Sequence, residues 1–322
     1  MNRRIPMAGL AALILISLFG CLPTLPLLPI SAAENIRQTT DGRVFVTGAD
    51  ALFEIMNNNG SETLQAVAIS GTVESENPEC RYYAGLAELN QWLFFVCAKQ
   101  SGLNLKTLKF EEAGILKAYS LIDGQVVDVM PLSGYQFPNG IDAYPQENAI
   151  LIADEDFILA NGGVSKATLD FSSGKPVLLH YEHQWIGPQH EVFAANGVRV
   201  LNESIFVTDI GYLKQIDLTP EGTPTKAINR FKNLTVLDDF DVFCDGFLVT
   251  DFVKGRLVYV PMEGEAVITA SGLTSPSAVL ARSTKFTESN TILVTESRGL
   301  SANKGNQLLS ISTHSLGIPD CE

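Results

Sequence analysis

Basic residues are scarce in this 322-residue chain, in which 22 Lys and Arg stand against 36 Asp and Glu and give a formal net charge of -14. Binding to the phosphates of nucleic acids needs clustered Lys and Arg, so the composition argues against a nucleic-acid partner. Histidine and cysteine are also rare, with four and five residues, and no cysteine pair has zinc-finger spacing. The Gly-x-Ser-x-Gly signature of one large class of serine hydrolases is absent from the sequence.

The N-terminus has the composition of an export signal. Residues 1–4 supply positive charge, and residues 7–19 form an apolar segment that is too short for a confident membrane span. Two endings of the signal stay open: Cys21 stands where a bacterial lipoprotein is lipidated, and residues 31–33 form an ordinary Ser-Ala-Ala cleavage site. We assign residues 1–33 to the signal and a tether, and expect a secreted, periplasmic or membrane-anchored protein.

Four cysteines remain apart from Cys21, and an oxidising compartment permits them to pair. Cys80 precedes one expected strand and Cys97 lies near the end of the next, so a hairpin would bring these two together. A bond between Cys244 and Cys321 would tie a late strand to the C-terminus. Four cysteines allow three pairings, so the connectivity stays open.

A unit of short strands recurs six times along residues 34–322. In its clearest copies an Asn or Asp opens an alternating strand, and a second apolar strand follows and ends in an aspartate. β-Branched and aromatic residues dominate these units, turn residues recur, and no amphipathic helix stands out. Repeats of 39 to 57 residues with three or four strands are typical of propeller blades. The sequence therefore predicts one all-β domain, a six-bladed β-propeller with four-stranded antiparallel blades.

The first strand of each propeller blade lines the central channel, so the equivalent first positions of the six units should form a ring around one mouth. These positions are Glu34, Ala84, Asn139, Asn196, Asp238 and Ser277. Four of them offer oxygen ligands, and Ca²⁺ accepts about six to eight such oxygens. The ring has no Cys or His, which argues against zinc and copper. Asn-Gly and Asp-Asp are also ordinary turn residues, but their shared register favours a single calcium ion in the channel.

The series Glu34, Asn139, Asn196 and Asp238 resembles the metal site of the calcium-dependent six-bladed propellers of the gluconolactonase (senescence marker protein) and paraoxonase group, over about residues 34–315. This resemblance implies a hydrolase of lactones or related esters, in which the cation polarises the carbonyl. Glu34, Asn196 and Asp238 would be direct ligands, and Asn139 a ligand or a substrate-orienting group. Asp238 or a nearby base would activate water.

Two features depart from the paraoxonase pattern. Ala84 stands where paraoxonases carry a ring histidine proposed to activate water, and Asn35 and Gly140 replace the aspartates of a second, structural calcium. The second departure favours a single-metal, gluconolactonase-like site. His190, six residues before Asn196, is the candidate for the missing catalytic base.

Two further features near the channel mouth have two explanations each. The acidic run from Asp154 to Asp156 either strengthens the field for a cation or is a solvated loop, and we favour the loop. Aromatic residues near the mouth either form an apolar pocket wall or pack between blades; they are Tyr82, Tyr83, Phe137, Trp185, Phe240 and Phe252.

Other functions stay open because propellers host many unrelated activities. One is a metal-independent enzyme of the strictosidine-synthase-like kind. Another is a non-catalytic propeller that binds a ligand or partner and holds a structural metal. We expect a monomer that acts on a small lactone or ester.

Overall fold

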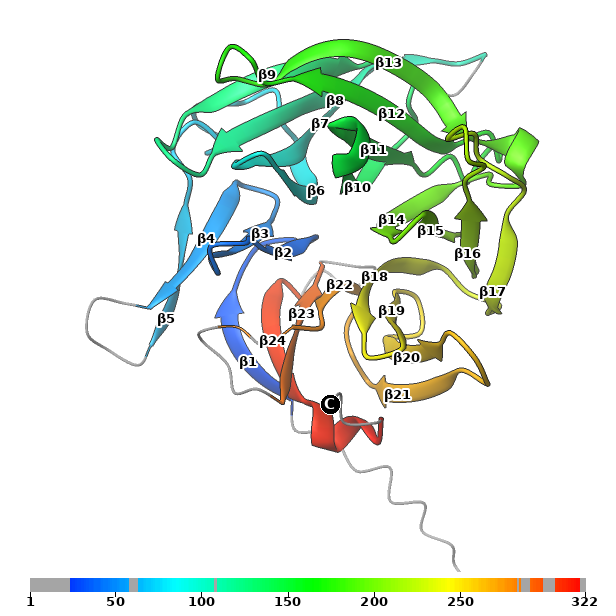
Figure 1. Ribbon diagram of the computed structural model, residues 1–322. Coiled ribbons are helices and arrows are strands. Elements are labelled where there is room, and N and C mark those ends of the chain that lie inside the picture. The colour runs from blue at the N-terminus through cyan, green and yellow to red at the C-terminus, as the bar shows by residue number, and fades with distance from the viewer. Residues whose placement is uncertain are drawn as a thin grey trace, which may run out of the picture.

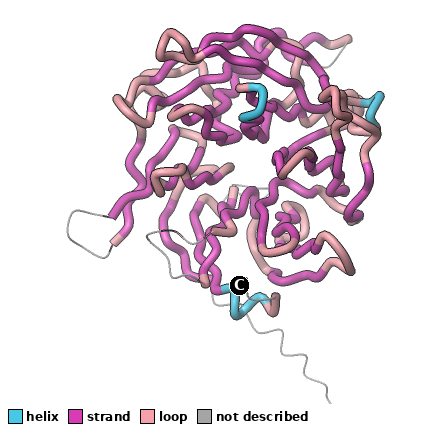
Figure 2. Tube along the Cα trace, in the orientation of Figure 1, coloured by secondary structure: helices cyan, strands magenta, loops and turns pink. Residues whose placement is uncertain are grey.

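The computed structural model describes residues 24–57, 63–106, 109–282, 284, 290–297 and 305–318. Six four-stranded antiparallel sheets are arranged radially around a common axis (Figure 1). Strands make up most of the trace, and the helices are single short turns at the periphery or between strands (Figure 2). The prediction of a six-bladed β-propeller is confirmed.

Each blade runs from an innermost strand at the axis to an outermost strand at the rim. The first three blades consist of β2 (Ile36–Gln38), β3 (Val44–Thr47), β4 (Leu52–Asn57) and β5 (Leu64–Ala68); β6 (Tyr82–Leu89), β7 (Trp92–Asn104), β8 (Lys109–Ser120) and β9 (Val126–Leu132); and β10 (Pro138–Tyr144), β11 (Ala149–Asp154), β12 (Gly163–Asp170) and β13 (Val177–Ile186). The last three consist of β14 (Ala195–Leu201), β15 (Ser204–Asp209), β16 (Tyr212–Asp217) and β17 (Ile228–Lys232); β18 (Leu237–Phe243), β19 (Gly246–Asp251), β20 (Arg256–Pro261) and β21 (Val267–Ser271); and β22 (Pro276–Leu280), β23 (Thr291–Glu296), β24 (Gln307–Ser312) and β1 (Thr24–Pro29). Short 3₁₀ helices are η1 (Pro145–Glu147), η2 (Pro188–His190) and η3 (Thr313–Leu316).

The N-terminal strand β1 closes the propeller by pairing with β24 as the outermost strand of the sixth blade. Its sequence contains prolines, which an outermost strand tolerates because one of its edges needs no ladder hydrogen bonds. Ile30 and Ala33, which follow β1, are buried. The folded domain therefore includes residues before Glu34, the predicted start, and part of the predicted tether belongs to a blade.

The core lies between neighbouring blades. Both faces of a blade's inner strands are covered by the adjacent blades, so these strands are buried along their length and mostly apolar instead of alternating. All six residues of β11 and all six of β19 are buried. The buried residues form clusters that join successive blades, such as the one shared by β10, β11 and strands of the second blade.

A disulfide joins Cys80 to Cys97, as predicted, and ties the segment before β6 to β7. Cys21 and Cys321 lie outside the described residues, so lipidation of Cys21 and a bond between Cys244 and Cys321 stay predictions. Within the described ranges, no helix has the length and apolar character needed to cross a membrane.

Candidate functional site

Four ring positions lie in β-bulges at the start of the innermost strands, whereas Glu34 lies just before β2. In four successive blades the pairing between the first and second strands shifts across the ring position, at Asn139, Asn196, Asp238 and Ser277. A bulge places two residues opposite one and re-aims their side chains, and bulges are frequent beside active sites. The same irregularity at the same place in these four blades explains why their ring side chains share one register.

Glycines after two ring positions allow neighbouring blades to approach closely. A Cβ atom at Gly85 would lie 2.4 Å from the carbonyl oxygen of Asn139, and one at Gly140 would lie 2.4 Å from that of Asn196. Both distances are shorter than any ordinary Cβ contact, so a side chain there would push the blades apart. Glycine at positions 85 and 140 is thus required by the close packing of neighbouring blades.

Threonines near the ends of the second strands link ring residues of adjacent blades. The Thr250 hydroxyl accepts a hydrogen bond from the backbone N–H of Asp239 at 2.9 Å and donates to the carbonyl of Ser277 at 2.9 Å. Thr208 and Thr295 make the same kind of link. The sequence carried a signal for this role, because Thr precedes the terminal acid in these strands.

The acids that end the second strands hold the segments leading into the ring. The Asp154 carboxylate accepts backbone N–H bonds from Gln136 at 2.8 Å and Phe137 at 2.9 Å. Asp209 and Glu296 likewise accept backbone N–H bonds from the segments before their own innermost strands. These buried carboxylates position the ring, and they are not among the described residues that line the cavity below.

One cavity of about 400 Å³ brings all four predicted ligand residues together. Glu34, Asn139, Asn196 and Asp238 contribute to its lining. The other described lining residues are Glu155, Ser297, Phe157, Ile210, Val236, Phe252 and Val253. The two small ring residues, Ala84 and Ser277, are not among them.

The polar part of this cavity concentrates negative charge. Burial is the main cause that raises the pKa of Glu34 to about 7, and hydrogen bonds to its carboxylate, including one from Ser277 at 3.3 Å, partly oppose the rise. Burial, together with the charges of Glu34 and Glu155, raises the pKa of Asp238 well above its usual range. No described lining residue is a Lys, Arg or His. A cation would offset this charge, so the oxygen set fits a hard divalent ion.

The donor set is a mixture of carboxylates and amides. In the described part of the chain, no group of three or more His, Cys, Asp or Glu side chains could hold a metal ion. Any metal here would therefore depend on the amide oxygens of Asn139 and Asn196 as well as on the carboxylates.

Glu155 lines the cavity, although the sequence favoured a solvated loop for residues 154–156. The solvated-loop explanation for residues 154–156 is wrong, because Asp154 and Asp156 are buried and Glu155 between them lines the cavity. Burial raises the pKa of Glu155 to about 7, and a hydrogen bond with Asn196 partly opposes the rise. Hydrogen bonds to Asp154 hold the end of β11 in place, so the next residue, Glu155, lies at the channel mouth.

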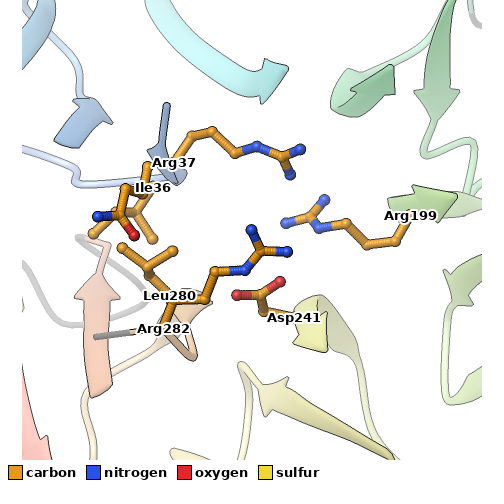
Figure 3. A pocket seen from close by; sticks show the side chains of 7 residues that line it. Ile36, Arg37, Arg199, Asp241, Leu280 and Arg282 are labelled. Atoms are coloured by element: carbon orange, nitrogen blue, oxygen red, sulfur yellow. The ribbon is translucent and has the colours of Figure 1, made fainter. Parts of the chain in front are cut away.

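A buried arginine lies behind the ring. Arg199 donates from its guanidinium to Asp239 Oδ2 at 2.8 Å, and Asn35 Nδ2 donates to the same oxygen at 2.8 Å. Arg199 also lines a small pocket, where its guanidinium and those of Arg37 and Arg282 point toward one another beside Asp241 (Figure 3). The guanidinium of Arg199 is thus the cation that pairs with the carboxylate of Asp239, the residue after Asp238.

His190 and most of the aromatic residues expected near the channel mouth are not among the described residues that line the cavity. His190 ends η2, where its Nδ1 accepts the backbone N–H of Gly187 at 3.4 Å, and it is not among the described cavity-lining residues. Of the aromatic residues expected near the mouth, Phe252 lines the cavity, whereas Tyr83 and Phe240 are fully buried in packing. Phe157, which the sequence analysis did not select, also lines it.

Several solved structures share this fold. A gluconolactonase from Xanthomonas campestris has a TM-score of 0.61 at 11% identity, with 90% of this chain and 89% of that chain covered. A luciferin-regenerating enzyme has a TM-score of 0.57 at 9% identity over 90% and 94% of the two chains. A chain of a nidogen–laminin complex has a TM-score of 0.51 at 13% identity over 84% and 93%. At such identities the likeness shows the fold alone.

No family model matches the chain, and no curated protein matches its sequence. The likeness to these solved structures shows the propeller fold and no particular superfamily. The similar structures include proteins whose names describe enzymes and a chain of a nidogen–laminin complex. The activity has to be argued from the site.

Proposed function

We propose that the protein is a calcium-dependent hydrolase of lactones or related esters. The observation that carries this proposal is the convergence of Glu34, Asn139, Asn196 and Asp238 on one cavity. Carboxylate and amide oxygens are the ligands that Ca²⁺ prefers. The fold likeness to a gluconolactonase supports the same reaction class.

The ring residues divide the work of the proposed reaction. Glu34, Asn139, Asn196 and Asp238 would hold the cation, which when bound supplies Lewis-acid polarisation of the substrate carbonyl. Asp238 accepts the proton of the attacking water, and Glu155 is a second carboxylate in the same cavity that can hold a proton.

The proposal includes the setting in which the protein acts. The apolar N-terminal segment supports export, and the protein would then act outside the cytosol, either free or attached to a membrane through a lipid on Cys21. Its cavity of about 400 Å³ suits a small-molecule substrate.

Hydrolysis of simple lactones and aryl esters, followed with and without chelator, tests the proposal. We expect EDTA to abolish turnover and added calcium to restore it. Asp238→Ala should remove both turnover and calcium binding measured by titration calorimetry, whereas Asp123→Asn, a change at an exposed turn, should remove neither. Full activity in chelator would refute the calcium requirement. Calcium binding without turnover across the panel would favour a non-catalytic binding protein.

A further inference from the structure

The described lining residues of the cavity fall into two chemically distinct sets. We call the polar set, the four ring residues with Glu155 and Ser297, the floor, and the five apolar side chains the wall. The wall residues are Phe157, Ile210, Val236, Phe252 and Val253. They come from the third, fourth and fifth blades, from the segments that begin the innermost strands or follow the second strands. The reacting carbonyl and the rest of the substrate would therefore meet different surroundings.

The wall offers little to a polyhydroxylated ligand. Its five side chains carry no hydrogen-bonding group, and no Lys, Arg or His is present among the described lining residues. Sugar hydroxyls placed against this wall would lose their hydrogen bonds to water without replacement, which is costly. An alkyl or aryl group in the same place would gain from leaving water.

The wall is partly exposed, and aromatic packing supports one of its side chains, Phe157. Phe157 is 56% exposed and Val253 is 58% exposed, although both line the cavity. The ring of Phe157 stacks on Phe137 with centroids 5.5 Å apart, and Phe137 packs edge-on against Phe110 of β8. A preformed, water-exposed apolar surface inside a binding cavity is a place where an apolar ligand gains affinity.

We propose that this site takes lactones or esters that carry an extended alkyl or aryl substituent, and discriminates against polyhydroxylated sugar lactones. The inference rests on the proposed function for the position of the carbonyl at the oxygen floor. The substituent lies along the wall formed by Phe157, Ile210 and Val253.

Non-hydrolysable lactams test the inference separately from catalysis. Titration calorimetry with calcium present would compare δ-lactams that bear ring alkyl chains of two, four, six and eight carbons with the lactam analogue of gluconolactone. We expect affinity to rise about fourfold for each methylene that the wall covers, and the sugar lactam to bind more weakly than the shortest alkyl probe. Affinity that is independent of chain length, or tighter binding of the sugar lactam, would overturn the inference.

Matched variants locate the binding surface. Phe157→Ser with Val253→Asn should weaken the eight-carbon lactam by at least about tenfold and leave the two-carbon lactam nearly unchanged. The control, Leu179→Ser with Ile268→Asn, changes residues that are 66% and 54% exposed on the outermost strands of the same two blades, and should change neither affinity. Equal loss in both double variants would overturn the assignment of the wall.

The outcomes separate this inference from the proposed function. Chain-length-dependent lactam binding without lactone hydrolysis would support the apolar subsite and reject the hydrolase. Hydrolysis that is equally fast for short-chain, long-chain and sugar lactones, with chain-independent lactam binding, would support the hydrolase and reject the apolar subsite.

Discussion

Replacing Arg199 by methionine should destabilise the propeller strongly, because it leaves the buried carboxylate of Asp239 without its cation. Arg199 is 4% exposed, and its guanidinium pairs at 2.8 Å with Asp239, which is 3% exposed. Removing one partner of a buried ion pair costs about 3–5 kcal/mol. Domains of ordinary stability have only about 5–15 kcal/mol in total. We therefore expect the melting temperature to fall by roughly 6–10 °C in a domain of this size.

The assay is urea unfolding of four proteins: the native chain, Arg199→Met, Asp239→Asn and the double variant. The double variant no longer leaves a charged Asp239 without its cation, so it should recover part of the stability that Arg199→Met loses. The recovery is incomplete because Asp142 and Asp241, which also interact with Arg199, keep their carboxylates. Lys226→Met is the control, because Lys226 pairs with Glu191 at 3.2 Å but the two side chains are 76% and 56% exposed, and it should cost about 1 kcal/mol or less.

Two results would contradict the reasoning about Arg199. A loss below about 1 kcal/mol in Arg199→Met would show that Asp239 does not need a buried partner. A double variant no more stable than Arg199→Met would show that the loss comes from packing and not from the stranded charge.

Two further predictions concern the acidic cavity and β1. The pKa values of Glu34 and Glu155 are raised to about 7 from an ordinary value of 4.5, so between these values the native state holds more protons than the unfolded chain. Without calcium, the contribution of these two groups to stability is greatest below pH 4.5 and is lost as the pH rises through 7. The thermal shift caused by saturating calcium should therefore be larger at pH 8 than at pH 5.5, and an equal shift would contradict this. Starting the chain at Glu34 removes β1 and uncovers the edge of β24. The melting temperature of this shortened protein should therefore lie below that of a chain starting at Thr24. Equal melting temperatures would show that the sixth blade does not need its outermost strand.

The sequence revealed the blades because their pattern is local. Strand alternation, turn residues and the terminal acids recur within each unit, and they predicted six blades and the ring register without any knowledge of packing. The same local pattern brought Cys80 and Cys97 together across one hairpin, and the structure confirms that bond.

The sequence was less informative where remote segments meet. The sequence around Arg199 does not indicate that it pairs with Asp239, forty residues away. The sequence of β1 does not indicate that it pairs with β24. His190 lies close to Asn196 in sequence, yet it is outside the described cavity lining. Sequence distance is a poor guide at the mouth, because each blade sends its loop there independently.

For this protein, the sequence by itself determined the all-β architecture and the positions of Glu34, Asn139, Asn196 and Asp238 around one mouth, since both follow from a repeat with a fixed register. Only the tertiary structure decided that Glu155 lines the same cavity and that apolar side chains from three blades also line it. The reason is physical: a repeat fixes where a strand begins, whereas the direction of a loop side chain depends on how neighbouring blades pack against it.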